Sequence, residues 1–378
     1  MKKILIWTLL LPALLTGCVR QEEAQPPAAG AAAWEGLHVE HSMELQYASQ
    51  FSVDYCQGGY KKISIGSDHE YLVIPEGAQI PDGVPEDVTV LQQPLDRIYL
   101  VATSAMDLFR ALDAVDTITL SGTDASGWYI PEARQAMEAG QMTYAGKYSA
   151  PDYELILSQG CDLAVESTMI YHTPEVNEQL ERFGIPVLVE RSSYESHPLG
   201  RVEWLKLYGA LLNEEKQAQA VFDGLMEGVA PILEQETTGK TVAFFYLTSN
   251  GAVNVRRSGD YIAQAIGLAG GIYLPRNLEE GDNALSTMNI QMETFYEQVQ
   301  NADILIYNST IDGELETIGQ LLEKSAVLGD FKAVQEGHVW CTGKNLFQES
   351  LGLGELIQDL HAVMTEEAPA LAYLRPLA

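Results

Sequence analysis

The sequence predicts an α/β fold made of two Rossmann-like lobes with mainly parallel sheets, joined by a long backbone helix. Two observations lead to this prediction. Short apolar runs alternate with helical patterns in both halves of the chain, which is typical of parallel sheets whose faces are covered by helices. Between the halves, residues 199–235 read as almost pure helix, because their apolar residues recur at helical spacing.

The N-terminal lobe is expected over residues 35–198. Gly184 should close its last helix, since glycine readily adopts the left-handed conformation of a C-cap. Two β-rich runs around a turn predict an extra β-hairpin at about 60–75, and the Pro-, Gly- and Asp-rich residues 76–94 should form a loop. Strands are expected at 98–101, 117–120, 162–165 and 186–189, and helices at 105–112 and 174–183.

The C-terminal lobe is expected over residues 236–378, where strands and helices alternate again. Within the connecting segment before it, Asn213 and the two glutamates that follow look like the N-cap and first turn of a helix. Strands are expected at 241–247, 303–307 and 338–341, and helices near 259–267, 290–300, 314–323 and 350–365.

The chain starts with a targeting segment, residues 1–17. Lys2 and Lys3 precede an apolar stretch that is too short to span a membrane, since a spanning helix needs about 20 apolar residues. The stretch ends in Leu-Thr-Gly followed by Cys18, which resembles a bacterial lipobox. We therefore expect a lipoprotein signal peptide, a flexible tether over residues 18–34, and an extracytoplasmic protein that is lipid-anchored to the bacterial cell membrane through Cys18. A plain signal peptide with an incidental cysteine is the alternative.

The composition excludes several classes of protein. The chain has 22 Lys and Arg against 53 Asp and Glu, for a formal charge of −31, so it does not suit the tracking of nucleic-acid phosphates. Loss of Lys2 and Lys3 with the signal peptide leaves the exported protein more acidic still. The other cysteines, Cys56, Cys161 and Cys341, are too few and too widely spaced for a disulfide framework or a zinc knuckle, and no metal site is expected.

No catalytic motif stands out in the sequence. It contains no G-x-S-x-G, no H-E-x-x-H, no phosphate-binding P-loop and no G-x-G-x-x-G after a strand. The Gly-rich residues 122–127 lack the lysine of a phosphate loop. We therefore expect that the protein is not an enzyme.

The two lobes repeat one sequence phrase. In residues 150–165 and in residues 289–306, a helix is followed by a short segment of polar and small residues that ends in an aspartate, Asp162 or Asp303. A strand begins at this aspartate. Further phrases follow in order at 183–187, 262–271 and 333–340. From about residue 97 to the C-terminus, this order resembles the helical-backbone substrate-binding proteins of iron-siderophore, haem and cobalamin ABC importers.

The resemblance implies a monomeric receptor that holds an iron complex, a ferric siderophore, between its lobes and delivers it to an ABC permease and its ATPase. A stiff helical connection would allow only small lobe motions. Haem or cobalamin, both tetrapyrroles, are the alternative ligands within the same type. Two other classes stay open, namely a surface-anchored sensor or scaffold and a chelatase-like enzyme, because one fold can host different functions.

The ligand groups are expected on loops at the carboxyl ends of the parallel strands, which face the cleft between the lobes. Loop aromatics are costly to leave in water unless they stack on a partner, and arginine binds carboxylate or catecholate oxygens in a bidentate way. Packing between loops and solvated ion pairing are the alternatives for these side chains. His172 or His197 could instead ligate haem or a metal, and Arg191 and Phe347 lie on the same loops. The candidate ligand-binding residues are Trp128, Tyr129, Lys147, Tyr148, Tyr171, Tyr194, Arg256, Arg257 and Lys344.

The resemblance also implies one acidic residue on each lobe that docks on an arginine pocket of the permease. By position, the first should lie at the start of the helix before Gly184, where Glu175 is found, with Glu178 one turn on. The second should precede the strand at Asp303, where Glu293 is found. The alternative role for either acid is to stabilise a helix N-terminus at the surface.

Overall fold

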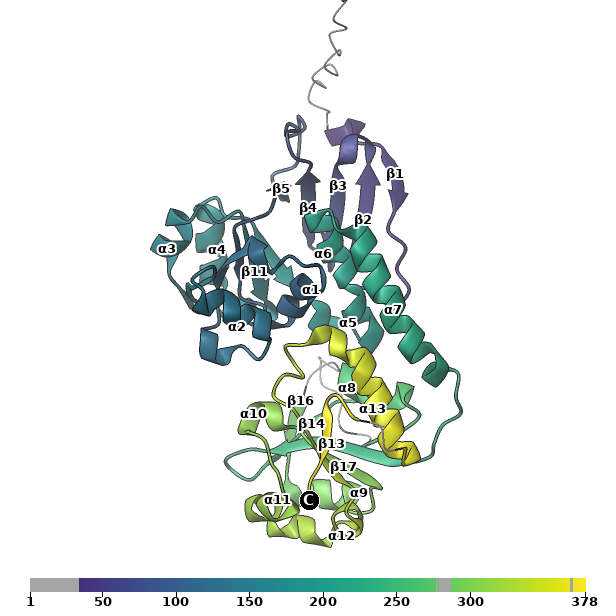
Figure 1. Ribbon diagram of the computed structural model, residues 1–378. Helices are drawn as coiled ribbons and strands as arrows, with labels where there is room; N and C mark the ends of the chain where they lie inside the picture. The colour runs from purple at the N-terminus through teal and green to yellow at the C-terminus, as the bar shows by residue number, and fades with distance from the viewer. Residues whose placement is uncertain (1–33, 277, 279–286, 368–369) are drawn as a thin grey trace, which may run out of the picture.

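A computed structural model describes residues 34–276, 278, 287–367 and 370–378 of the chain (Figure 1). The expectations for the signal peptide, for most of the tether and for lipid attachment at Cys18 fall on residues outside this description. No helix in the described ranges is both long enough and apolar enough to cross a membrane. The described residues form an N-terminal antiparallel-type sheet, two α/β lobes and a helical connection between the lobes.

The N-terminal sheet has five strands in the order β1-β2-β3-β4-β5, and all neighbours are antiparallel except β4 and β5. The expected hairpin is present as β3 and β4, but it is the middle of a larger sheet. The expectation of a loop over residues 76–94 is wrong, because its last part forms β5 against β4. The strands are β1 (Val39–Ser42), β2 (Phe51–Cys56), β3 (Lys61–Ile65), β4 (His69–Ile74) and β5 (Val88–Gln92).

The first lobe is built on a parallel five-stranded sheet of order β12-β11-β6-β7-β8. The four strands expected from sequence are all present within one or two residues, and a short β8 extends one edge. A two-stranded ribbon, β9 (Gly146–Lys147) with β10 (Ala150–Pro151), precedes α3. The sheet and its helices are β6 (Ile98–Leu100), β7 (Ile118–Ser121), β8 (Thr143–Tyr144), β11 (Leu163–Ser167), β12 (Val187–Glu190), α1 (Met106–Ala111), α2 (Pro131–Glu138), α3 (Tyr153–Ser158) and α4 (Pro174–Arg182).

The connection between the lobes consists of three helices, α5 (Pro198–Glu203), α6 (Leu205–Leu212) and α7 (Glu215–Leu233), and not of one uninterrupted helix. Asn213 ends α6 in the left-handed conformation, with φ 62°, instead of capping the next helix. The buried Lys61 Nζ of β3 donates to the Ala210 carbonyl at 2.5 Å and to the Asn213 Oδ1 at 2.9 Å. The N-terminal sheet thus binds the connection at the point where the chain turns from α6 into α7.

The second lobe has a seven-stranded mixed sheet, with the path β16-β14-β13-β17-β18-β19 and with β15 also paired to β13. The strands β13, β15, β17 and β18 are parallel, whereas β14, β16 and β19 run antiparallel to their neighbours. The strands and helices are β13 (Thr241–Leu247), β14 (Val253–Arg256), β15 (Ile272–Leu274), β16 (Thr287–Ile290), β17 (Ile304–Tyr307), β18 (Val339–Thr342), β19 (Leu374–Pro376), α8 (Tyr261–Leu268), α9 (Met292–Val299), α10 (Ser309–Asp312), α11 (Ile318–Lys324), α12 (Lys332–Glu336) and α13 (Leu353–Thr365).

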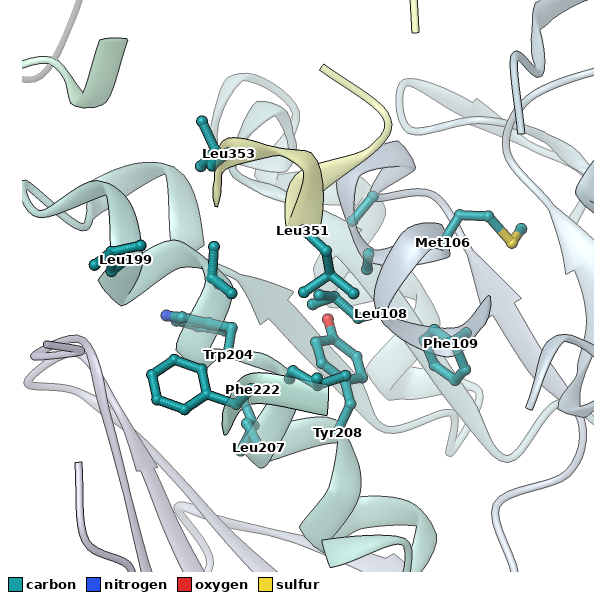
Figure 2. Packing of buried hydrophobic residues seen from close by; sticks show 14 of the residues in the cluster. Met106, Leu108, Phe109, Leu199, Trp204, Leu207, Tyr208, Phe222, Leu351 and Leu353 are labelled. Atoms are coloured by element: carbon teal, nitrogen blue, oxygen red, sulfur yellow. The ribbon is translucent and has the colours of Figure 1, made fainter. Parts of the chain in front are cut away.

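One hydrophobic core runs through the centre of the molecule and includes residues of every part of the chain. Figure 2 shows Phe109 of α1 beside Tyr208 of α6, with Leu351 from the segment before α13 close by. The rings of Phe109 and Tyr208 pack edge to face with centroids 5.1 Å apart. Because these side chains are close-packed, the helical connection joins the lobes through a continuous core that resists large changes in lobe orientation.

Candidate functional site

The carboxyl ends of the parallel strands of the two lobes meet at Gln348, in the loop after β18. Its Oε1 accepts the backbone N–H of Tyr129 at 2.7 Å, and its Nε2 donates to the carbonyl of Gly127 at 2.7 Å. Both partners belong to the loop after β7 of the other lobe. Since the side-chain amide uses its donor and its acceptor on one short loop, it fixes how the two strand-end surfaces face each other.

Further hydrogen bonds continue this contact between the lobes. The Ser350 hydroxyl donates to the carbonyl of Ser104 at 2.6 Å, and the Leu351 N–H donates to the Asp107 Oδ2 at 2.9 Å. Asp107 is fully buried and also pairs with Arg110. The segment that leads into α13 is thereby bound to α1 of the first lobe, and the candidate site lies along the strand-end loops on either side of this contact.

Large apolar side chains are exposed on these strand-end loops. Tyr129 after β7 is 39% exposed, Met169 and Tyr171 after β11 are 45% and 43% exposed, and Ile311 after β17 is 61% exposed. Exposure of such side chains costs free energy unless something covers them. Sequence analysis found the two tyrosines but missed Met169 and Ile311, because a single aliphatic residue in a loop carries no pattern that separates it from core residues.

The other aromatic and cationic candidates of the first lobe have mixed outcomes. Trp128 is fully buried and its indole N–H donates to the Ser121 hydroxyl at 3.2 Å, so the expectation that its ring faces a ligand is wrong. Lys147 is exposed on the β9–β10 ribbon. Tyr148 is half-buried against the core between the sheet and helices α3 and α4.

Tyr171 and Tyr194 lie together around Arg191, which directly follows β12. The Arg191 guanidinium lies 4.9 Å from the centroid of the Tyr194 ring. Burial raises the pKa of the Tyr171 hydroxyl, and the nearby charge of Arg191 opposes that rise. Asp68, in the β3–β4 turn of the N-terminal sheet, completes the group, with its Oδ1 3.6 Å from an Arg191 Nη1. The sequence pattern suggested the three loop residues, but it gave no sign that Asp68 would join them.

Arg256 is the last residue of β14, not part of a loop after β13 as expected, and its side chain is turned into the lobe. Its guanidinium pairs with the buried Asp260 at 3.2 Å and is surrounded by the rings of Phe244, Tyr261 and Phe347. The Asp260 carboxylate raises the pKa of Arg256 against the effect of burial, so the pair stays charged inside the lobe.

Of the remaining candidates of the second lobe, Lys344 lies in the loop after β18, whereas Arg257 directly follows the antiparallel strand β14 and lies away from the carboxyl ends of the parallel strands. Arg257 is half-buried, as is Lys344. The Lys344 backbone N–H donates to Glu314 Oε1 at 3.2 Å. Phe347, which was expected on the ligand side, covers Arg256 at 5.0 Å from the guanidinium carbon to the ring centroid.

The histidines form no metal site within the described ranges, where no group of three or more His, Cys, Asp or Glu side chains converges. His197 accepts the Leu199 N–H on Nδ1 at 3.2 Å and stacks on Tyr47. Burial lowers the pKa of His197, which favours the neutral ring that this cap needs. His172 is exposed after β11.

The expected docking acids both lie in the first turn of a helix and are exposed, Glu175 in α4 and Glu293 in α9. The internal repeat adds a third acid. Glu154 is exposed in the first turn of α3, and α3 leads into β11 as α9 leads into β17. The repeated architecture therefore makes Glu154, more than Glu175, the counterpart of Glu293.

A cavity of about 420 Å³ lies at the opposite, amino ends of the strands of the second lobe. Apolar atoms of Ile304, Trp340 and Leu371 line it, and Lys240 and Glu366 pair at its rim at 3.6 Å. This cavity is formed by one lobe alone. It is therefore the alternative ligand position with which a site between the lobes can be compared in an experiment.

Comparison with known proteins identifies the family. Residues 99–346 match the family model described as periplasmic binding protein. The chain belongs to the periplasmic binding protein family. It is therefore a binding protein, and the expectation that it is not an enzyme is confirmed. The N-terminal sheet precedes the matched residues.

The similar proteins agree with this assignment. An uncharacterized lipoprotein of Methanocaldococcus jannaschii is 22% identical over 406 residues, covering 97% of this chain and 94% of the relative. A periplasmic heme binding protein from Pseudomonas aeruginosa superposes with a TM-score of 0.57 at 17% identity, covering 75% of this chain and 98% of that one. The catecholate-siderophore binding protein VctP from Vibrio cholerae superposes with a TM-score of 0.56 at 16% identity, covering 72% of this chain and 95% of that one. These likenesses confirm the expected two-lobe α/β fold.

Proposed function

We propose that this periplasmic binding protein captures a ferric siderophore between its two lobes and delivers it to the permease and ATPase of an ABC importer. The observation that carries the proposal is the exposure of Tyr129, Met169, Tyr171 and Ile311 on strand-end loops of both lobes. A ligand with flat, ring-bearing faces would cover these side chains from both sides. The similar structures include proteins described as binding heme and a catecholate siderophore.

Membrane attachment is part of the same proposal. The lipobox at Cys18 and the description of similar proteins as lipoproteins support a lipid anchor on the outer side of the cell membrane. The permease would then lie within reach of the tether, residues 18–34. We propose Glu293, together with Glu175 or Glu154, as the acids that contact the permease.

Haem is the second candidate ligand, because the exposed Tyr171 presents a phenol that can ligate haem iron, next to the apolar Met169. Haem also carries carboxylates, which the neighbouring Arg191 could bind. Cobalamin would use the aromatic surface without needing a cation.

A titration of intrinsic fluorescence tests the proposed function. Ferric catecholate, haem and cyanocobalamin are added separately to the wild-type protein, and at least one of the first two should quench the emission saturably. Tyr171→Ala should weaken that binding about fivefold, since a lost aromatic contact is worth on the order of 1 kcal/mol. Ile80→Ala is the matched control, because Ile80 is 56% exposed in the N-terminal sheet region and far along the chain from the strand-end loops. Absence of binding of all three ligands would refute the proposed ligand class.

A further inference from the structure

The N-terminal sheet is fixed rigidly to the strand-end loop after β12. Glu195 of that loop accepts the backbone N–H groups of Ser49 and Gln50 at 2.9–3.0 Å. Glu203 of α5 accepts those of Gln46, Tyr47 and Ala48 at 2.8–3.0 Å. Both carboxylates are buried. The segment between β1 and β2 therefore moves with the loop and not as an independent domain.

The β3–β4 turn of the sheet is shaped around Arg191. Gly66 of the turn has φ +66°, and a Cβ at this position would lie 2.7 Å from an Arg191 Nη1. Glycine adopts this backbone conformation readily, and a larger residue here would also require the tip of the Arg191 side chain to shift. The turn thus contacts the arginine closely, although the turn lies outside the residues that match the family.

Arg191 is held in place with part of its hydrogen-bonding capacity unused. Its side chain is 17% exposed, and its Nε is buried without a hydrogen-bond partner among the described residues. Its ionic partner Asp68 is 3.6 Å away and 64% exposed, so this pair is open to solvent and weak. The Tyr194 ring lies against the guanidinium, and the exposed Tyr171 is near enough for the charge of Arg191 to act on its hydroxyl.

We infer that the β3–β4 turn of the N-terminal sheet is a wall of the ligand site, and that Asp68 occupies the place on Arg191 which an anionic group of the ligand takes. The Arg191 guanidinium should bind carboxylate or catecholate oxygens of a ligand more tightly than it binds the distant Asp68 carboxylate. The reason is that a guanidinium can make two parallel hydrogen bonds to such oxygens. Displaced Asp68 returns to water at little cost, since it is already mostly exposed. The inference rests on the proposed function and narrows its ligand to an anionic complex.

Three variants test the inference with the intact mature protein. Arg191→Gln should weaken binding of ferric 2,3-dihydroxybenzoate or haem at least tenfold. Asp68→Asn should strengthen it severalfold, because the internal competitor is lost. Glu70→Gln removes the same negative charge from an exposed residue of β4, close to Asp68 in the chain. This variant should bind the ligand like wild type. Circular dichroism melting should show that all three variants remain folded.

The outcomes separate the inference from the proposed function. If wild type binds an anionic complex but Asp68→Asn and Arg191→Gln bind it equally well, the inference is overturned and the proposed function stands. If Arg191→Gln failed to fold, the inference would still be overturned by an Asp68→Asn variant that binds the anionic complex no more tightly than wild type. Binding of neutral cyanocobalamin alone would also overturn it, whereas binding of none of the probes would overturn both.

Discussion

Glu166, near the end of β11, is a fully buried carboxyl group whose two oxygens have no hydrogen-bond partner among the described residues. Burial raises its pKa to about 8, so it is mainly protonated at neutral pH. It shares the sheet face with Tyr99, one strand away, and lies in the apolar core under α3 and α4. A neutral acid avoids the much larger cost of a buried unpaired charge.

Glu166→Gln should make stability less dependent on pH. The pKa of Glu166 rises from 4.5 to about 8 on folding, so between these values the native protein holds a proton that the unfolded chain has lost. The contribution of Glu166 to the free energy of unfolding therefore falls as pH rises through that window, by up to about 1.4 kcal/mol per pH unit. Thermal melting at pH 5 and pH 8 measures this, with the exposed Glu154→Gln as control. An equal loss of melting temperature in variant and wild type between these pH values would contradict the account.

At the scale of residues, the sequence indicated which loops matter better than which side chains face a ligand. The aromatic pair Trp128-Tyr129 followed a strand as expected, whereas the pair Arg256-Arg257, expected in the loop after β13, lies at the end of the antiparallel strand β14. Whether a loop side chain turns inward depends on partners far along the chain. Phe347 covers Arg256 from a loop about ninety residues later, and no local pattern contains that information.

The proposed contact with the permease depends on helices α3, α4 and α9, each of which has an exposed glutamate in its first turn. Replacement of Glu175 and Glu293 by Ala should leave ligand binding intact and abolish ligand-stimulated ATP hydrolysis by the reconstituted importer, because only the contact with the permease is lost. The same double change with Glu154 in place of Glu175 tests the acid that the internal repeat favours.

Glu323→Ala on the exposed side of α11 is the matched control for these double variants and should stimulate like wild type. If both double variants stimulated ATP hydrolysis normally, the docking role would be wrong for all three acids. Loss of stimulation in only one of them would assign the acid of the first lobe.

The elements were predictable where local pattern and burial agree. The strands expected from their largely apolar residues are all present, namely β6, β7, β11, β12, β13, β17 and β18. The strand β5 was missed because it is only five residues long and follows a Pro- and Asp-rich stretch, so only its pairing with β4 reveals it. The break at Asn213 was misassigned because the contact from Lys61 that stabilises it comes from a distant strand.

On the scale of the whole molecule, the shared core and the bond from Gln348 to the first lobe describe two lobes that meet at their strand ends and rotate little. The sequence predicted the two lobes through their repeated phrases, and the family match confirms them. It did not predict that the N-terminal sheet is tied to the first lobe, because buried carboxylates such as Glu203 look like surface acids in a chain with 53 acidic residues.

Hydrogen–deuterium exchange with and without bound ligand tests the central claim most directly, that the ligand lies between the lobes at the carboxyl ends of their strands. We expect the ligand to slow exchange in residues 122–130, 168–173 and 191–197 of the first lobe and in 308–313 of the second. Protection confined to the cavity at the amino ends, around Lys240, Trp340 and Leu371, would contradict the account.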